Sequence, residues 1–153
     1  MKVSEVMTSP PVTVVPGLRL AEAARRMAEA AVGSLLVVDD EGAPAGIVTD
    51  RDIALRGLGG GLDPDTAVDA VMSPRVVTVD ADDDLQAAYR AFRRTGVRRL
   101  PVLELGRVVG VLTIDDLFLD VFRRLADLLG PVARTVLQEP SERGSVGGTS
   151  HVS

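Results

Sequence analysis

The sequence predicts an α/β fold built from two copies of one strand-helix-strand-strand-helix unit, followed by a C-terminal helix. The first observation is an internal repeat. Residues 46–53 and 110–117 share a pattern of glycine, two aliphatic residues, threonine, two variable residues, aspartate and an aliphatic residue. The second observation is that β-branched runs alternate with apolar residues at helical spacing in both halves. With only 3% aromatic residues, the chain suits thin helix-on-sheet layers.

The two halves align with a nearly constant offset. Val6-Met7 matches Val71-Met72 at an offset of 65 (71 − 6), and Thr49 matches Thr113 at an offset of 64 (113 − 49). The missing residue falls at a glycine turn, where a hairpin tolerates a change of length. The alignment predicts repeats over 1–60 and 61–125, a helical extension over 126–138 and a tail over 139–153.

In the first copy, a β-branched run at 12–15 predicts a strand that ends at a Pro-Gly pair. Apolar residues then recur at helical spacing over 20–31 and predict a helix that covers the sheet. Two apolar runs, at 34–38 and 45–48, flank a turn at Gly42 and predict a hairpin of buried strands.

The second copy follows the same order. It predicts a strand at 76–79, a helix over 82–94 and a hairpin formed by 100–103 and 107–112. Asp82 to Asp84 fall in the first turn of this helix, where acidic side chains stabilise the helix dipole, so we do not interpret them as a metal site. The glycine-rich segment 57–64 predicts a flexible linker between the copies.

Beyond the second copy of the pattern, an amphipathic helix is predicted to run to Leu129. Gly130-Pro131 is expected to end it, and residues 132–137 are expected to form one more short helix. The Ser- and Gly-rich residues from 139 onward predict disorder.

Composition excludes several classes of function. The chain of 153 residues contains no Cys, which excludes disulfides and thiolate sites, and its single histidine, His151, lies in the polar tail. The net charge of −5 argues against nucleic acid or an anionic membrane as partner. Neither a signal peptide nor an apolar run of membrane-spanning length is present, so we expect a cytoplasmic protein.

Three motifs together resemble the tandem CBS (cystathionine-β-synthase) repeat, usually found as a pair called a Bateman module. They are Val-Met-Thr-Ser-Pro at 6–10, Val-Gly-Ser-Leu-Leu-Val-Val-Asp at 32–39, and Gly-Ile-Val-Thr-Asp-Arg-Asp-Ile at 46–53, each with a counterpart in the second half. The resemblance covers roughly residues 1–120. It implies two β-α-β-β-α units about a pseudo-twofold axis, with clefts for AMP, ADP, ATP or S-adenosylmethionine. No catalytic domain is attached, so the chain resembles a stand-alone regulatory pair.

The repeated Thr-x-x-Asp has two compatible interpretations. Thr49 with Asp52, and Thr113 with Asp116, stand at predicted strand-to-helix junctions, where this spacing is nearly a capping box. An aspartate at such a junction can also accept hydrogen bonds from a ribose diol, and the threonine hydroxyl can donate or accept beside it. The resemblance favours the ribose role.

Arg98 and Arg99 precede a predicted strand, and a guanidinium pair there suits the binding of phosphate oxygens. The resemblance supports this role, whereas Arg107 is expected at the surface. Gly33 and Ser34 occupy the equivalent positions of the first copy. We therefore predict two unequal sites.

The resemblance implies that each cleft combines the Thr-x-x-Asp of one copy with the leading strand of the other. The weaker cleft, which lacks the two arginines, would suit a nucleoside or a less charged ligand. The main site is expected to contain Thr113, Asp116, Arg98, Arg99, Thr8, Thr13, Val32 and Ser34. The weaker site is expected to contain Thr49, Asp52, Ser73, Thr78 and Val97.

The sequence therefore predicts a non-enzymatic sensor that needs no cofactor and binds an adenine nucleotide or S-adenosylmethionine as a regulatory ligand. The alternative is a ligand-independent homodimer or interaction scaffold, since CBS pairs commonly dimerise through their helices. An enzyme is disfavoured because the sequence offers no nucleophile with a neighbouring base. Neither hypothesis identifies the protein that would be regulated.

Overall fold

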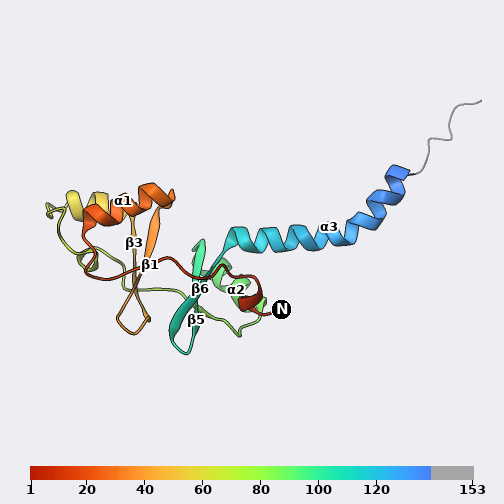
Figure 1. Ribbon diagram of the computed structural model, residues 1–153, viewed down its shortest axis with the longest axis horizontal. Helices are drawn as coiled ribbons and strands as arrows, with labels where there is room; N and C mark the ends of the chain where they lie inside the picture. Colours follow the sequence, from red (N-terminus) through yellow and green to blue (C-terminus); the bar gives the residue numbers. More distant parts are fainter. Residues whose placement is uncertain (139–153) are drawn as a thin grey trace, which may run out of the picture. The chain divides into compact units, whose positions relative to one another are not determined.

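The computed structural model describes residues 1–138, with side chains described as far as Pro131. The chain divides into two units, Met1–Leu117 and Phe118–Ser153. The first unit contains two three-stranded sheets, in the orders β1-β2-β3 and β4-β5-β6, one from each repeat (Figure 1). The predicted α/β class is confirmed.

The first sheet consists of β1 (Thr13–Val14), β2 (Ser34–Val38) and β3 (Pro44–Thr49), and α1 (Leu20–Ala30) connects β1 to β2. β1 is parallel to β2, and β2 is antiparallel to β3, as the predicted hairpin requires. The apolar stripe of α1 and the continuous apolar character of β2 form one core. That core includes Leu20, Ala23, Met27, Leu35, Val37 and Val48.

The second sheet repeats this arrangement with β4 (Val79–Asp80), α2 (Leu85–Thr95), β5 (Arg99–Glu104) and β6 (Arg107–Thr113). The predicted helix start at 82 is wrong by a few residues, because the Asp84 carboxylate caps α2 by accepting from the Gln86 amide at 2.9 Å. The predicted strand at 76–79 is also largely wrong, since only its last residue belongs to β4. The core includes Leu85, Ala88, Phe92, Leu100, Val102 and Leu112.

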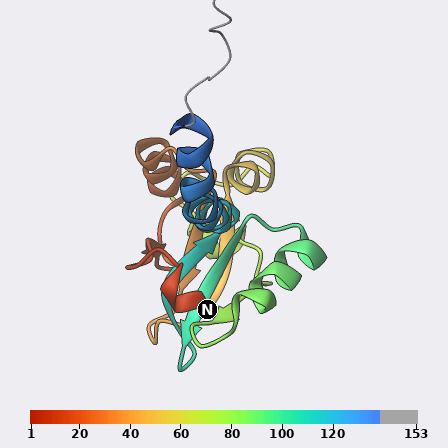
Figure 2. The same ribbon diagram turned by 90° about the vertical axis from the view of Figure 1, so that its right-hand side faces the viewer.

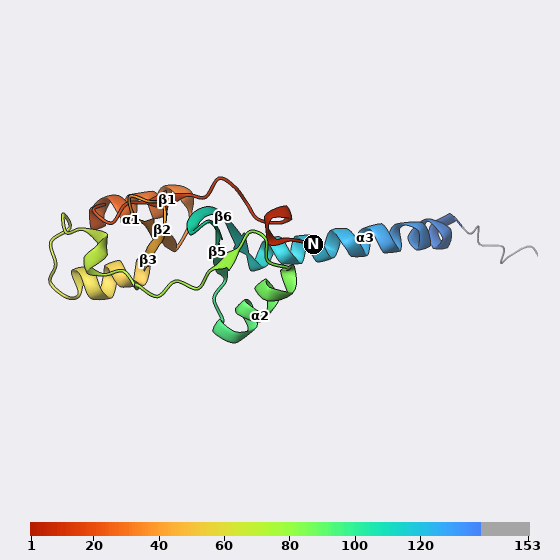
Figure 3. The same cartoon turned by 90° about the horizontal axis from the view of Figure 1, so that it is seen from below.

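Each core is completed by a segment from the other half of the sequence. Residues 1–11, here called the first crossing segment, bury Val3 in the core of the second repeat. Residues 65–75, the second crossing segment, bury Val68 and Val71 in the core of the first. Figure 3 shows the two segments running in opposite directions between the repeats. They contain the short helices η1 (Val3–Glu5) and η3 (Val68–Ala70).

The glycine that opens each repeated pattern lies under a crossing segment. Thr8 and Val111 exchange two backbone hydrogen bonds, of 2.9 and 3.0 Å, which hold the first crossing segment against β6. A Cβ atom on Gly110 would lie 2.5 Å from the Met7 sulfur, so only glycine fits without a shift. At Gly46, a Cβ atom would lie 2.7 Å from both a methionine sulfur and a backbone oxygen of the second crossing segment. Close backbone approach therefore explains both glycines.

After the first Thr-x-x-Asp, the chain forms the short π-helix η2 (Asp52–Leu58), which contacts α1. Figure 2 shows α1 and η2 as two separate coils near the top of the view. The prediction of a flexible linker over 57–64 is wrong at its start. Gly57 is buried, and a Cβ atom there would lie 3.1 Å from the Leu20 side chain. The Leu62 amide also donates to the Gly57 carbonyl at 3.0 Å. Small size at the α1 contact, rather than chain flexibility, explains this glycine.

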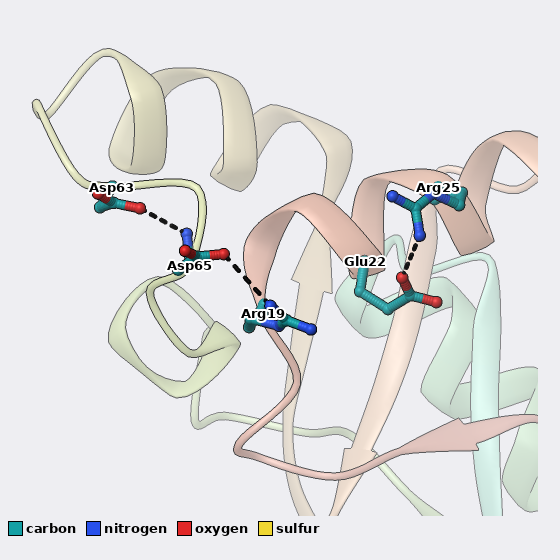
Figure 4. A network of polar contacts seen from close by, with 5 residues as sticks. All are labelled: Arg19, Glu22, Arg25, Asp63 and Asp65. Carbon is teal, nitrogen blue, oxygen red and sulfur yellow. Dashed lines mark hydrogen bonds and ion pairs between the residues drawn. The ribbon is translucent and has the colours of Figure 1, made fainter.

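The end of the linker is bound to the start of α1. The Ala21 amide donates to the Pro64 carbonyl at 3.0 Å. The Arg19 guanidinium lies 3.5 Å from the Asp65 carboxylate, and the Asp65 amide donates to Asp63 at 2.8 Å (Figure 4). These contacts fix the start of the second crossing segment against α1 of the first repeat.

Helix α3 (Ile114–Gln138) is one continuous helix with Pro131 inside it. The prediction that Gly130-Pro131 ends the helix, and that residues 132–137 form a separate one, is therefore wrong. Proline removes one backbone donor and crowds the preceding turn, which can bend a helix without ending it. The ribbon of α3 changes direction before its C-terminal end (Figure 1). The predicted disorder from residue 139 onward lies outside the described residues.

From Phe118 onward, α3 exposes a row of large apolar side chains. Phe122 is 65% exposed and Leu128 is 70% exposed. Among the described residues, no helix combines the length and apolarity needed to cross a membrane. The other exposed apolar residues of the row are Leu119, Val121, Leu125 and Leu129.

Candidate functional site

A cleft of about 460 Å³ lies between the two repeats and is walled mainly by apolar side chains. Arg99 from β5 lines it, as do Arg26 and Glu29 from the C-terminal half of α1. The apolar wall includes Val12, Val32, Leu36, Ile47, Pro101 and Val111. An apolar cleft with a few charged lining residues can hold a flat apolar ring system that carries polar groups.

The cleft is built from equivalent positions of the two copies. Ser34 and Arg99 both line it, as do Ile47 and Val111. The first pair opens β2 and β5, and the second pair lies inside β3 and β6. One ligand in this cleft would therefore touch both repeats.

Strand geometry directs both threonines of the repeated motif toward the cleft side of their sheets. Thr49 is two residues after Ile47, and Thr113 is two residues after Val111. Because alternate residues of a strand project from the same face, each threonine shares the face of a residue that lines the cleft.

Both Thr-x-x-Asp motifs form reciprocal capping boxes. The Thr113 amide donates to Asp116 Oδ2 at 3.0 Å, and the Asp116 amide donates to Thr113 Oγ1 at 3.0 Å. The corresponding distances for Thr49 and Asp52 are 2.9 and 3.1 Å. The capping interpretation is confirmed, and the caps hold each aspartate in a fixed position from which it can also bind a ligand.

The two aspartates differ in what their second carboxylate oxygen contacts. Asp52 Oδ1 lies 3.8 Å from the Arg56 guanidinium. In the described part of the chain, Asp116 Oδ1 has no hydrogen bond or ion pair, because the residue one turn later is Asp120, which pairs with Arg124 at 3.1 Å. Asp116 is therefore the better acceptor for an additional hydrogen bond.

The crossing segments bring further predicted residues beside the motif strands. Thr8 pairs with Val111 on β6, the strand that leads to the second motif, and Ser73 pairs with Ile47 on β3, which leads to the first. Thr13 on β1 lies opposite Leu36, a residue that lines the cleft. Each motif is thus flanked by the leading segment of the other copy.

The predicted arginines differ in position. Arg99 lines the cleft, whereas Arg98 directly precedes β5 and its carbonyl accepts from the Ile114 amide at 3.0 Å. Both side chains are exposed, and neither forms an ion pair with any described residue. Two uncompensated cations beside a capped Thr-x-x-Asp can bind an anion.

The structure brings together only part of each predicted set. Val32, Ser34 and Arg99 line the cleft, while Thr113 and Asp116 lie beyond it at the junction of β6 and α3. From the weaker set, Thr78 lines a different hollow of about 580 Å³ along α2. Thr49, Asp52, Ser73 and Val97 do not line the cleft. The ligand-binding role of all these residues stays a prediction.

Sequence reasoning missed most of the apolar wall and the two charged residues of α1. The period of two along each strand could have identified Ile47 and Val111, because they precede the motif threonines by two positions. No periodic pattern in the sequence identifies Arg26 and Glu29 as cleft residues, because only the packing of α1 places them there. Within the described residues, no group of three metal-ligating side chains gathers.

Comparison with known proteins gives a consistent result. The family model for the CBS domain matches residues 3–58 and 68–122. The CBS domain-containing protein YhcV of Bacillus subtilis is 36% identical over 115 residues, covering 75% of this chain and 81% of that protein. Protein MK0525 of Methanopyrus kandleri is 31% identical over 119 residues, covering 76% of this chain but only 61% of that longer protein.

Two solved structures of CBS proteins contain adenosine compounds. The CBS domain protein PAE2072 from Pyrobaculum aerophilum, in complex with AMP, has a TM-score of 0.65 and 29% identity, covering 76% of this chain and 89% of that chain. The CBS domain pair of protein MJ0100, in complex with 5′-methylthioadenosine and S-adenosyl-L-methionine, has a TM-score of 0.65 and 25% identity, covering 76% and 96%. With both of its repeats matched by one family model, the chain belongs to the CBS domain family and carries a pair of these domains.

Proposed function

We propose that this protein is a non-enzymatic regulatory module that binds an adenosine-containing ligand between its two CBS repeats. The observation that carries the proposal is the apolar cleft lined by Arg99, beside strands that lead into capped Thr-x-x-Asp motifs. AMP in PAE2072, and 5′-methylthioadenosine with S-adenosylmethionine in MJ0100, support this class of ligand. AMP, ADP, ATP and S-adenosylmethionine are the candidates.

In the main site, the base would lie between apolar side chains such as Val32 and Val111, near Thr8, Thr13 and Ser34. The ribose diol would donate to Asp116 Oδ1, which has no described protein partner, while Thr113 holds the carboxylate in place. Arg98 and Arg99 would bind the phosphate, because a guanidinium matches phosphate oxygens in geometry and charge.

The weaker site would use the first motif. Thr49 and Asp52 take the roles of the second-copy pair, with Ser73 beside β3. Thr78 and Val97 complete the predicted set of this site, and Thr78 lines the hollow along α2. The ion pair of Asp52 with Arg56 supports lower affinity, since a ribose would compete with the guanidinium for the same oxygen.

Binding of the ligand would be communicated to the rest of the molecule through the ligand's contacts with both repeats and through α3. The ligand-binding Asp116 lies in the first turn of α3, and the same helix continues into the exposed apolar row that begins at Phe118. A ligand that orders the start of this helix would change how the row is presented to a regulated protein or to a second copy of the chain.

Thermal unfolding tests the proposal directly. A ligand at about one hundred times its dissociation constant stabilises the folded state by about 2.7 kcal/mol. We expect a rise in melting temperature with at least one of AMP, ADP, ATP and S-adenosylmethionine, and a smaller rise in the Asp116→Ala variant. The absence of any shift at millimolar concentrations of all four would contradict the proposal. Mass spectrometry of the denatured protein would identify a co-purified ligand.

A second candidate function is a ligand-independent homodimer or scaffold. It is favoured by the exposed apolar row of α3 and by the capping boxes, which explain the Thr-x-x-Asp motifs without a ligand. Size-exclusion chromatography with light scattering distinguishes the two functions. A scaffold would keep the same oligomeric state with and without nucleotide, and would lose it when Phe122 and Leu125 are replaced by serine.

A further inference from the structure

We infer that α3 pairs with the same helix of a second copy of this chain, in antiparallel orientation, through the exposed apolar row that begins at Phe118. This inference rests on the second candidate function, the scaffold, and adds the partner and the geometry of the contact. It does not depend on ligand binding. The row lies entirely in the second unit of the chain and in one continuous helix, so its spacing can be analysed by itself.

Helix geometry gathers four side chains of the row in a central stripe, formed by Phe118, Phe122, Leu125 and Leu129. Successive members are four, three and four positions apart, so they align along one side of an α-helix. By the same periodicity, the charged residues of this stretch fall on the other side of the helix; they are Asp120, Arg123, Arg124 and Asp127. Covering the stripe would therefore bury no charge.

The stripe has the same spacing in both directions along the helix, because it is symmetric about the midpoint between residues 123 and 124. A twofold contact between identical chains uses the same patch on both, so this symmetry suits a second copy. In an antiparallel pair with this register, Phe118 faces Leu129 of the second copy, and Phe122 faces its Leu125. A parallel pair would instead place phenyl against phenyl and leucine against leucine, whereas large side chains interdigitate better with smaller ones.

The row is large enough for a stable contact. It comprises seven apolar side chains between residues 118 and 129 that are 40–70% exposed. At about 150 Å² for a whole large side chain, these exposed fractions amount to on the order of 600 Å² of apolar surface per chain. A standard interface buries about 800 Å² per partner, of which about 57% is apolar. The row can therefore supply the apolar share of a stable dimer interface.

The acidic first turn of α3 also favours the antiparallel orientation. Asp115 and Asp116 lie in this turn. A parallel pair would bring the first turns of both helices together and so place four carboxylates near one another, and such like-charge contacts are unfavourable. In the antiparallel register, the two first turns are more than about 20 Å apart, at a rise of about 1.5 Å per residue.

A second copy suits the row better than a lipid surface does. Amphipathic helices that lie on membranes carry mainly Lys and Arg on their polar side. The polar side of this stretch carries two aspartates and two arginines, whose charges cancel. An anionic membrane would therefore gain no electrostatic attraction from it, whereas pairing with an identical helix depends only on the apolar row.

Disulfide cross-linking of the full-length protein tests the orientation, because the sequence contains no Cys and each introduced thiol is the only one in its chain. Phe118→Cys and Leu129→Cys proteins are mixed under mild oxidation, and intact mass spectrometry identifies the linked chains. We expect mainly mixed dimers, because a disulfide requires Cα atoms within about 7 Å, whereas this pairing separates the two copies of residue 118 by about 16 Å. Arg123→Cys, on the polar side, is the control and should not cross-link. Cross-links mainly between like variants would overturn the inference.

Light scattering tests the contact without any cysteine. Phe122→Ser should raise the dissociation constant of the dimer about a hundredfold, because a symmetric contact loses this side chain twice. Leu105→Ser is the matched control, since Leu105 is 98% exposed and lies outside α3, and it should leave the dimer unchanged.

Two failures can be distinguished. A dimer that withstands Phe122→Ser overturns this contact but leaves the scaffold function in place. A wild-type protein that remains monomeric overturns both, and so does a monomer that binds vesicles of phosphatidylcholine and phosphatidylglycerol through the row.

Discussion

Replacing Gly110 by alanine would test the crossing of the first segment over β6. The added methyl group would lie 2.5 Å from the Met7 sulfur and 3.0 Å from the Thr8 carbonyl oxygen. Relief of this overlap requires the segment to move away from the strand. That movement would stretch the two hydrogen bonds between Thr8 and Val111, of 2.9 and 3.0 Å.

The expected cost follows from these contacts. Overpacking by a methyl group costs about 1–3 kcal/mol. Each backbone hydrogen bond contributes about 0.5–1.5 kcal/mol net. Replacing glycine by alanine restores about 0.4–1 kcal/mol by restricting the unfolded chain. We therefore expect Gly110→Ala to lose about 2–4 kcal/mol of unfolding free energy, or about 4–16 °C in melting temperature.

Urea unfolding followed by circular dichroism measures this loss. Gly17→Ala is the matched control, because a Cβ atom at Gly17 would meet nothing within 4 Å and the residue does not have a positive φ angle. We expect the control to be as stable as the wild type or slightly more stable. An unchanged urea midpoint for Gly110→Ala would refute the close packing of Met7 over β6, and with it the exchange of segments between the repeats.

Three further predictions concern the motifs and α3. Asp116→Ala and Asp52→Ala should each lose about 0.5–1.5 kcal/mol of unfolding free energy, because each removes the cap hydrogen bond. Calorimetry should find that only Asp116→Ala strongly weakens AMP binding. Equal losses of AMP affinity would contradict unequal sites. Arg99→Ala should lower the affinity for AMP about tenfold by removing a charge-assisted contact and leave the urea midpoint unchanged, whereas a parallel loss of stability would indicate a structural role. Phe122→Ser should leave the unfolding of residues 1–117 unchanged while altering self-association in light scattering, and a large fall in stability would show that this side chain is not exposed.

Much of the fold could be predicted because its signals are local. The repeated Thr-x-x-Asp, the helical spacing of α1 and the apolar runs of the hairpins each depend on residues close in sequence. The exchange of crossing segments depends instead on packing between segments that are distant in sequence, so neither Val3 nor Val68 could be assigned to a core in advance. Gly46 and Gly110 were the indirect signal, because a glycine inside a strand often marks close approach by another backbone.

The candidate site was predictable to a smaller extent. The two aspartates and Arg99 could be selected because their chemistry suits a nucleotide and their spacing recurs. The apolar wall could not, because valine and isoleucine are equally suited to a core and to a cleft. The wrong prediction that the helix ends at Pro131 also came from a residue that is compatible with two structures. A proline late in a helix marks its end only when the neighbouring residues do not continue the helical pattern.

The exchange of crossing segments also determines how this molecule can be divided. A fragment that ends between the repeats would keep its own sheet but lack Val68 and Val71, and its partner fragment would lack Val3. Neither half is a finished domain, so the two repeats should unfold together in a single cooperative transition rather than one after the other. A lone repeat could complete its core only by taking the leading segment of another molecule, which makes the covalent pair the smallest independent folding unit.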